Sequence, residues 1–136
     1  AKSASFIQAF SKIGLIPDSG GTWFPPRLIG DARAMALALT GEKLPAETAA
    51  EWGLIWKCVA DEELLVQAGA VAKQFAAGPT RAYARIKESV QAASTNTLEA
   101  QLDVERDFMA ELGRSNDYRE GVAAFMEKRA PNFAGK

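Results

Sequence analysis

The fold is decided by the stretch Ile13-Gly14-Leu15-Ile16-Pro17-Asp18-Ser19-Gly20-Gly21-Thr22-Trp23. An apolar run leads into a proline, which fixes its own φ and favours an extended conformation at the residue before it. The two glycines that follow allow backbone angles and close approaches that side chains resist. One carboxylate, that of Asp18, therefore stands between an apolar segment and a helix predicted over 22–28.

Two interpretations of Asp18 follow from its place in the chain. Either Asp18 or Ser19 can cap the helix, because a side-chain oxygen there accepts from the first free N–H groups. Alternatively, Asp18 is an acid/base group, since burial beside Ile16 and Pro17 favours the protonated form and a helix N-terminus favours the charged form. Spacing alone favours the cap, because capping aspartates are the commoner class.

Composition bounds what the chain can do. The 136 residues suffice for one core, and a net charge of −1 gives no strong attraction to nucleic acid or to an acidic membrane. The absence of histidine removes Ser–His and Cys–His nucleophile pairs and the commonest metal ligand, so no metal site is expected. No apolar run approaches the roughly 20 residues of a membrane span. A single cysteine, Cys58, excludes an internal disulfide and suits a reducing cytoplasm.

The sequence pattern predicts two short strands and many helices. Apolar and aromatic residues predict strands over 4–10 and 54–59, with Trp52, Trp56 and Cys58 in the core. The other periodic segments predict helices over 22–28, 32–39, 46–52, 61–75, 81–93, 98–113 and 117–128. Expected ends are caps at Asp31, Asp61, Thr97 and Ser115 or Asn116, a start at Pro45, and stops at Gly41 and Gly53. A strand over 4–10 also needs sheet neighbours that these runs do not supply, which favours a missing N-terminal part.

Residues 14–22 resemble the "G-x-I-P-x-x-G-G-T" signature of the crotonase (enoyl-CoA hydratase/isomerase) superfamily. Further matching segments follow in the family's order, and the resemblance covers nearly the whole chain: residues 6–10, 26–30, 34–37, 40–42, 49–55 and 120–133. It implies an α/β crotonase (ClpP/crotonase-like) fold, of which this chain is the C-terminal part. Residues 1–60 would then hold the last strands of the β-β-α core, and residues 61–136 a helical region for oligomerisation and active-site cover. The N-terminal half is expected to precede Ala1. One departure is Pro25, where the family usually has an apolar residue before a single proline.

The resemblance also implies a chemistry. In the family, two backbone N–H groups bind the thioester oxygen and stabilise an enolate, while acidic residues move protons on the acyl carbons. Both N–H groups belong to segments expected before Ala1. The resemblance makes Asp18 the catalytic acid/base, and Ile16, Pro17 and Trp23 substrate-binding. Phe125 and Lys128 are implied near coenzyme A, which enters only as part of the substrate thioester; no other cofactor is expected.

Phe10 favours one reaction over another. The family's hydratases carry a catalytic glutamate eight positions before the acid site, where this chain has Phe10. An acid at Asp18 resembles branches that isomerise ring-containing acyl-CoAs, including the ring epoxide of phenylacetyl-CoA in phenylacetate degradation. The alternatives are an enoyl-CoA hydratase of fatty-acid or aromatic-acid catabolism and a non-catalytic assembly fragment.

The last two predicted helices carry apolar, basic and acidic side chains whose roles are oligomerisation, CoA binding or simple solvation. The resemblance implies a homotrimer or a dimer of trimers, and apolar stripes on helices 98–113 and 117–128 favour a homo-oligomer. The basic pair Lys128–Arg129 either complements a helix dipole or binds CoA phosphate. Carboxylates of helix 98–113 suggest a solvated or interface face rather than a metal site: Asp103, Glu105, Asp107 and Glu111.

Overall fold

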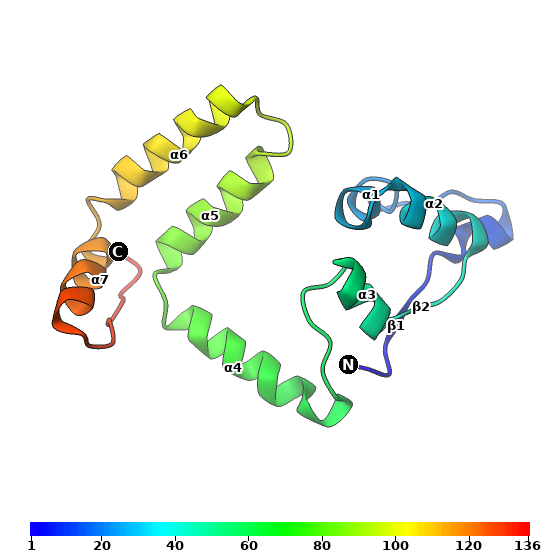
Figure 1. Ribbon diagram of the computed structural model, residues 1–136, viewed down its shortest axis with the longest axis horizontal. Coiled ribbons are helices and arrows are strands. Elements are labelled where there is room, and N and C mark those ends of the chain that lie inside the picture. Colours follow the sequence, from blue (N-terminus) through cyan, green and yellow to red (C-terminus); the bar gives the residue numbers. More distant parts are fainter. The chain divides into compact units, whose positions relative to one another are not determined.

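The computed structural model describes residues 1–136, which divide into two compact units, 1–67 and 68–136. The first contains β1 (Ser5–Phe6), the 3-10 helix η1 (Ala9–Ile13), α1 (Phe24–Ile29), α2 (Asp31–Thr40), β2 (Leu44–Pro45), α3 (Ala46–Trp52) and η2 (Asp61–Glu63) (Figure 1). Helix α4 (Leu64–Ala76) begins in the first unit and continues into the second, which also holds α5 (Thr80–Ala92), α6 (Leu98–Leu112) and α7 (Asn116–Glu127).

A two-stranded sheet ties the start of the chain to the middle of the first unit. Strand β1 pairs antiparallel with β2, with Ser5 opposite Pro45 and Phe6 opposite Leu44. The strand predicted over 4–10 is thus confirmed for two residues only, because β1 ends at Phe6 and η1 begins at Ala9. Pro45 is tolerated in a sheet that has only edge strands.

The strand predicted over 54–59 is wrong. These residues form bends and irregular chain, and the only backbone link to the start of the chain here runs from Lys2 N–H to the Val59 carbonyl at 2.9 Å. Trp56 is 81% exposed, so its assignment to the core is also wrong, while Trp52 and Cys58 are half-buried. An apolar run becomes a strand only where a partner strand completes its hydrogen bonds.

Helix ends in the first unit are set mainly by backbone geometry. Gly41 and Gly53 end α2 and α3 in the left-handed conformation with φ of 59° and 83°, as predicted. Pro45 precedes α3, as predicted. The caps predicted at Asp31 and Asp61 are wrong: neither α2 nor η2 has a side-chain cap, and the Asp61 carboxylate accepts instead from the backbone N–H and hydroxyl of Ser3.

The buried core of the first unit is small. It consists of residues from α1, α2, β2 and α3, mostly alanines: Ile29, Ala34, Leu44, Ala46 and Ala49. Many larger apolar side chains of this unit are exposed, including Ile7, Leu15 and Phe24.

In the second unit, α5 and α6 pack against each other (Figure 1). The carboxylate of Glu111 on α6 lies 2.9 Å from both Arg81 and Arg85 of α5, and these hydrogen bonds lower the pKa of Glu111. Thr97 caps α6 by accepting from the Ala100 N–H at 3.2 Å, as predicted. Two other α6 carboxylates, Asp103 and Asp107, both pair with Arg106. Arginine pairing therefore accounts for three of the four carboxylates weighed as metal ligands.

The tail after α7 turns back along that helix (Figure 1). Ser115 caps α7 by accepting from the Tyr118 N–H at 3.0 Å, as predicted. The buried carboxylate of Asp117 accepts from the backbone N–H groups of Ala134 at 2.7 Å and Gly135 at 2.9 Å. The Asp117 N–H in turn donates to the Lys136 carbonyl at 3.0 Å. None of the helices is both long enough and apolar enough to span a membrane.

Candidate functional site

The signature loop, residues 13–23, is built on a tight turn. The Asp18 carbonyl accepts from the Gly21 N–H at 2.7 Å, closing a four-residue turn. The two central residues, Ser19 and Gly20, have φ of 50° and 84°. Positive φ at both central positions is the pattern of a type I′ turn, which a non-glycine residue such as Ser19 adopts at an energetic cost.

Two of the three glycines in the loop, Gly20 and Gly21, are required by close approaches. A Cβ on Gly20 would lie 2.8 Å from the Phe24 ring, and a Cβ on Gly21 would lie 2.8 Å from the Pro17 Cβ and 3.0 Å from the Asp18 carbonyl oxygen. Real Cβ atoms essentially never come closer than 3.0 Å to other heavy atoms. Gly20 therefore lets the loop pack against Phe24 at the start of α1, and Gly21 lets the turn close against Pro17.

The helix-cap interpretation of Asp18 is wrong. Helix α1 begins at Phe24, after Trp23 as its N-cap residue, and has no side-chain cap. The Gly20 carbonyl accepts from the N–H groups of Trp23 at 2.9 Å and Phe24 at 3.0 Å. Pro25 is the residue at which this chain departs from the family's usual pattern. It lies in the first turn of α1, where its missing N–H costs nothing, as expected.

The Asp18 side chain has neither a hydrogen-bond donor nor an ion-pair partner in the structure, and it is exposed. The burial beside Ile16 and Pro17 that the sequence suggested is not seen: Ile16 is 77% exposed and Pro17 half-buried. A carboxylate without an internal partner is available to a bound molecule.

The fourth residue predicted on this loop, Trp23, is half exposed and has an arginine stacked on it. The Arg27 guanidinium lies 3.3 Å from the centre of the indole ring and also donates to the Trp23 carbonyl at 3.1 Å. Stacking by a cation holds the indole in one orientation. The loop thus carries Ile16, Pro17, Asp18 and Trp23 within eight consecutive residues.

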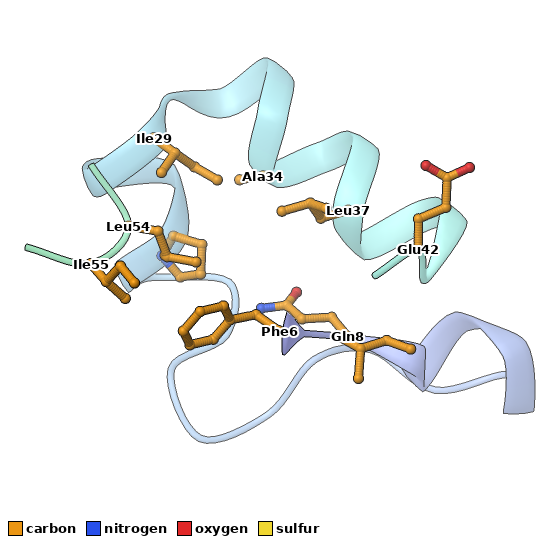
Figure 2. A pocket seen from close by; sticks show the side chains of 10 residues that line it. Phe6, Gln8, Ile29, Ala34, Leu37, Glu42, Leu54 and Ile55 are labelled. Atoms are coloured by element: carbon orange, nitrogen blue, oxygen red, sulfur yellow. The ribbon is translucent and has the colours of Figure 1, made fainter. Parts of the chain in front are cut away.

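An apolar cavity of about 320 Å³ lies beside the loop in the same unit (Figure 2). Its walls come from β1, α1, α2 and the segment after α3: Phe6, Ile7, Pro25, Ile29, Ala34, Leu37, Leu54 and Ile55. Only Gln8 and Glu42 add polar groups, and Figure 2 shows the Glu42 carboxylate pointing away from the apolar side chains. Gln8 links the cavity to the loop, because its Nε2 donates to the Gly21 carbonyl at 3.4 Å.

None of the predicted site residues lines this cavity. Sequence reasoning missed it because four separate segments build it, and no local pattern brings them together.

The predicted CoA residues lie at the end of α7 in the second unit. Phe125 is 82% exposed and lines an apolar cavity of about 440 Å³ together with Met109, Tyr118 and Phe133. Lys128 is exposed and ends α7 in the left-handed conformation, with φ of 55°. It takes part in none of the ion pairs.

Arg129 behaves differently from Lys128. Its guanidinium donates twice to Glu120, through Nη1 at 2.6 Å and Nη2 at 3.0 Å, and its Nε donates to Glu127 at 2.6 Å. The hydrogen bonds from Arg129, and then from the Asn132 N–H, hold the pKa of Glu120 at about 2. The hydrogen bonds that Arg129 donates to Glu120, and then to Glu127, raise the pKa of Arg129. The sequence singled out the basic pair but not Glu120, because nothing local shows that a carboxylate nine residues earlier binds one member of it.

The whole chain is similar to known proteins of one family. The family model for enoyl-CoA hydratase/isomerase matches residues 1–136. The chain is 56% identical to the 1,2-epoxyphenylacetyl-CoA isomerase of Escherichia coli (strain K12) over 136 residues, which are 100% of this chain and 52% of that protein. It is 51% identical to a probable enoyl-CoA hydratase of Rhodobacter capsulatus, again over 136 residues, with 100% of this chain and 53% of that protein covered.

A solved structure shows the same fold. The crystal structure of enoyl-CoA hydratase from Bacillus anthracis superposes with a TM-score of 0.93 at 32% identity, covering 99% of this chain and 52% of that one. The chain thus spans about half the length of the curated relatives it matches.

Proposed function

Because the chain belongs to the enoyl-CoA hydratase/isomerase family, with the crotonase fold its motifs predicted, we propose that the full-length protein carrying it is an acyl-CoA isomerase. The substrate we propose is a ring epoxide of phenylacetyl-CoA, the compound for which the Escherichia coli relative is named. An isomerisation keeps every atom of its substrate and needs no co-reactant.

The observation that carries the choice is Phe10. Syn addition of water requires two acids, and the family's hydratases place one of them where this chain has Phe10. Phe10 lies on η1, half-buried, and η1 contains no acidic residue. Removing one of the two acids favours isomerisation, in which a single group takes a proton and returns it.

Asp18 is the group we propose for that proton transfer. Its carboxylate has no internal partner, and the tight Ser19–Gly20 turn holds its backbone. Ile16, Pro17 and Trp23 on the same loop would contact the acyl group, since an aromatic ring packs well on apolar and aromatic side chains. The oxyanion donors would come from the family segments that lie outside this chain.

Phe125 and Lys128 are proposed to contact coenzyme A. An exposed aromatic ring and an unpaired ammonium suit the adenine ring and the phosphates of CoA. We further propose a homotrimer or a dimer of trimers, because exposed apolar side chains recur along α6 and α7: Leu98, Leu102, Met109, Tyr118, Val122 and Phe125. We place the protein in the cytoplasm, consistent with its single free cysteine.

One observation favours a second function. The Rhodobacter capsulatus relative, at 51% identity, is described as a hydratase, so hydration of an enoyl-CoA is the alternative. A non-catalytic assembly fragment is the remaining candidate for this chain on its own.

The test is a pair of assays on the full-length protein, with epoxyphenylacetyl-CoA and with crotonyl-CoA. The isomerase proposal expects turnover of the epoxide and slow or no hydration of crotonyl-CoA. Fast hydration of crotonyl-CoA would favour the hydratase instead. An intact-mass measurement must show that the assayed protein is full length. A preparation of this chain alone is expected to be inactive, because it lacks the oxyanion donors.

A further inference from the structure

Resting on the CoA site proposed above, we propose that Glu120 and Arg129 position Lys128 for the phosphates of CoA, and that Arg129 is not itself a phosphate ligand. The basic pair at the end of α7 would then consist of one ligand and one positioning residue.

Arg129 is occupied by its own chain. A guanidinium has five N–H groups. Four hydrogen bonds leave Arg129: two to Glu120, one to Glu127 and one to the Ala130 carbonyl at 3.3 Å. The two parallel bonds to Glu120 form the bidentate pairing that a phosphate would otherwise receive. A phosphate could bind Arg129 only by displacing carboxylates that already neutralise it.

Lys128 is held in place by its backbone rather than by its side chain. Its left-handed φ of 55° is uncommon for a residue other than glycine and persists where the surroundings fix it. The ammonium has no ion-pair partner and the residue is exposed. An exposed and unpaired ammonium therefore sits on one of the two non-glycine positions with positive φ.

The tail supplies that support on the other side of Lys128. Glu120 accepts from Arg129 and also from the Asn132 N–H at 2.8 Å, while Asp117 accepts from Ala134 and Gly135. Lys128 thus lies where the chain reverses direction between α7 and the tail. Glu120 and Asp117 on α7 hold that tail against the helix through these hydrogen bonds. Loosening the Glu120–Arg129 pair would redirect Lys128 without touching the ligand.

The experiment measures the affinity of the full-length protein for free CoA and for pantetheine, which lacks the nucleotide phosphates. The variants are Lys128→Gln, Arg129→Lys and the two combined. Arg119→Lys is the control, because Arg119 lies on the same helix and its guanidinium donates only to the Arg114 carbonyl. We expect each single change to weaken CoA binding roughly tenfold, the size of one lost charge-assisted hydrogen bond. Pantetheine binding should stay within about twofold, and Arg119→Lys should change neither affinity.

The double variant separates positioning from direct contact. If Arg129 acts through Lys128, the combined change costs no more than about twofold beyond Lys128→Gln alone. Losses that multiply to about 100-fold, or an Arg129→Lys variant that binds CoA normally, would overturn the inference and leave the proposed CoA site intact. If the unmutated protein binds no CoA, the proposed function fails, and this inference with it. Should Arg129→Lys lower the melting temperature, Glu120→Gln tests the same pair from its other side.

Discussion

The guanidinium of Arg129 and the carboxylate of Glu120 face each other in two parallel hydrogen bonds of 2.6 and 3.0 Å. The Glu120 side chain is 25% exposed and that of Arg129 42% exposed, so the pair is partly shielded from solvent. Bidentate geometry of this kind fixes orientation as well as charge. The pair therefore links the first half of α7, where Glu120 lies, to the tail that follows the helix.

Low pH should weaken the Glu120–Arg129 ion pair, because protonation removes the charge of the Glu120 carboxylate. The pKa of Glu120 is about 2 in the folded chain against an ordinary 4.5, so the folded state releases the proton more readily than the unfolded state. The stabilisation by this group is then fully present above the unfolded pKa and is lost as the pH falls from 4.5 towards 2. We expect Glu120→Gln to flatten the acid-side loss of stability in urea unfolding of the full-length protein across that window.

A matched control separates Glu120 from general acid denaturation. Glu51→Gln, on α3, removes an exposed carboxylate that belongs to no ion pair, and it should leave the pH dependence as it is. Equal flattening by the two substitutions would show that the Arg129 contact does not set the titration of Glu120.

The signature loop should not tolerate a side chain at Gly20. Its φ of 84° and the Phe24 ring 2.8 Å from an added Cβ make Gly20→Ala doubly unfavourable. We expect the free energy of unfolding to fall by at least about 1–2 kcal/mol and turnover to fall with it, since Asp18 precedes this turn. Gly69→Ala is the control: on α4, with nothing within 4 Å of an added Cβ, it should gain roughly 0.5–1 kcal/mol. A Gly20→Ala protein as stable and active as the unmutated one would contradict the turn geometry.

Assembly should depend on the apolar side of α6. Leu102 is 53% and Met109 70% exposed, and we propose that a second copy covers them. Light scattering at micromolar concentration should give an oligomer for the unmutated full-length protein and a smaller species for Leu102→Glu and Met109→Glu. Ala110→Glu adds the same charge elsewhere on α6 and should leave the mass unchanged. A monomeric unmutated protein would end the proposal, and an oligomer indifferent to both stripe substitutions would move the interface to another surface.

Local signals in the sequence predicted the parts of the fold that local hydrogen bonds decide. The caps at Thr97 and Ser115 and the left-handed glycines Gly41 and Gly53 each act within a few residues. Their chemistry is complete in the sequence, so the helix boundaries near them were predictable.

Long-range contacts decided what the sequence could not predict. Strand β1 pairs with Leu44–Pro45, a dipeptide without a strand pattern, whereas the strand-like run over 54–59 finds no partner. Asp117 is buried because residues 17 and 18 positions later return to it. At the candidate site, the motif located Asp18. Only the structure shows that the first N–H groups of α1 donate to the Gly20 carbonyl. The Asp18 carboxylate is therefore not needed as a cap and has no partner.

The central claim is that Asp18 transfers the proton in an acyl-CoA isomerisation. Its most direct test is the turnover of epoxyphenylacetyl-CoA by full-length protein carrying Asp18→Asn, beside Asp31→Asn as an exposed control on α2. Asparagine keeps the size of the side chain and removes the titrating proton, and Asp18 has no internal partner to lose, so the melting temperature should hold. Turnover should fall at least about 100-fold with Asp18→Asn and stay unchanged with Asp31→Asn. An Asp18→Asn protein that isomerises the epoxide at nearly the unmutated rate would contradict the account.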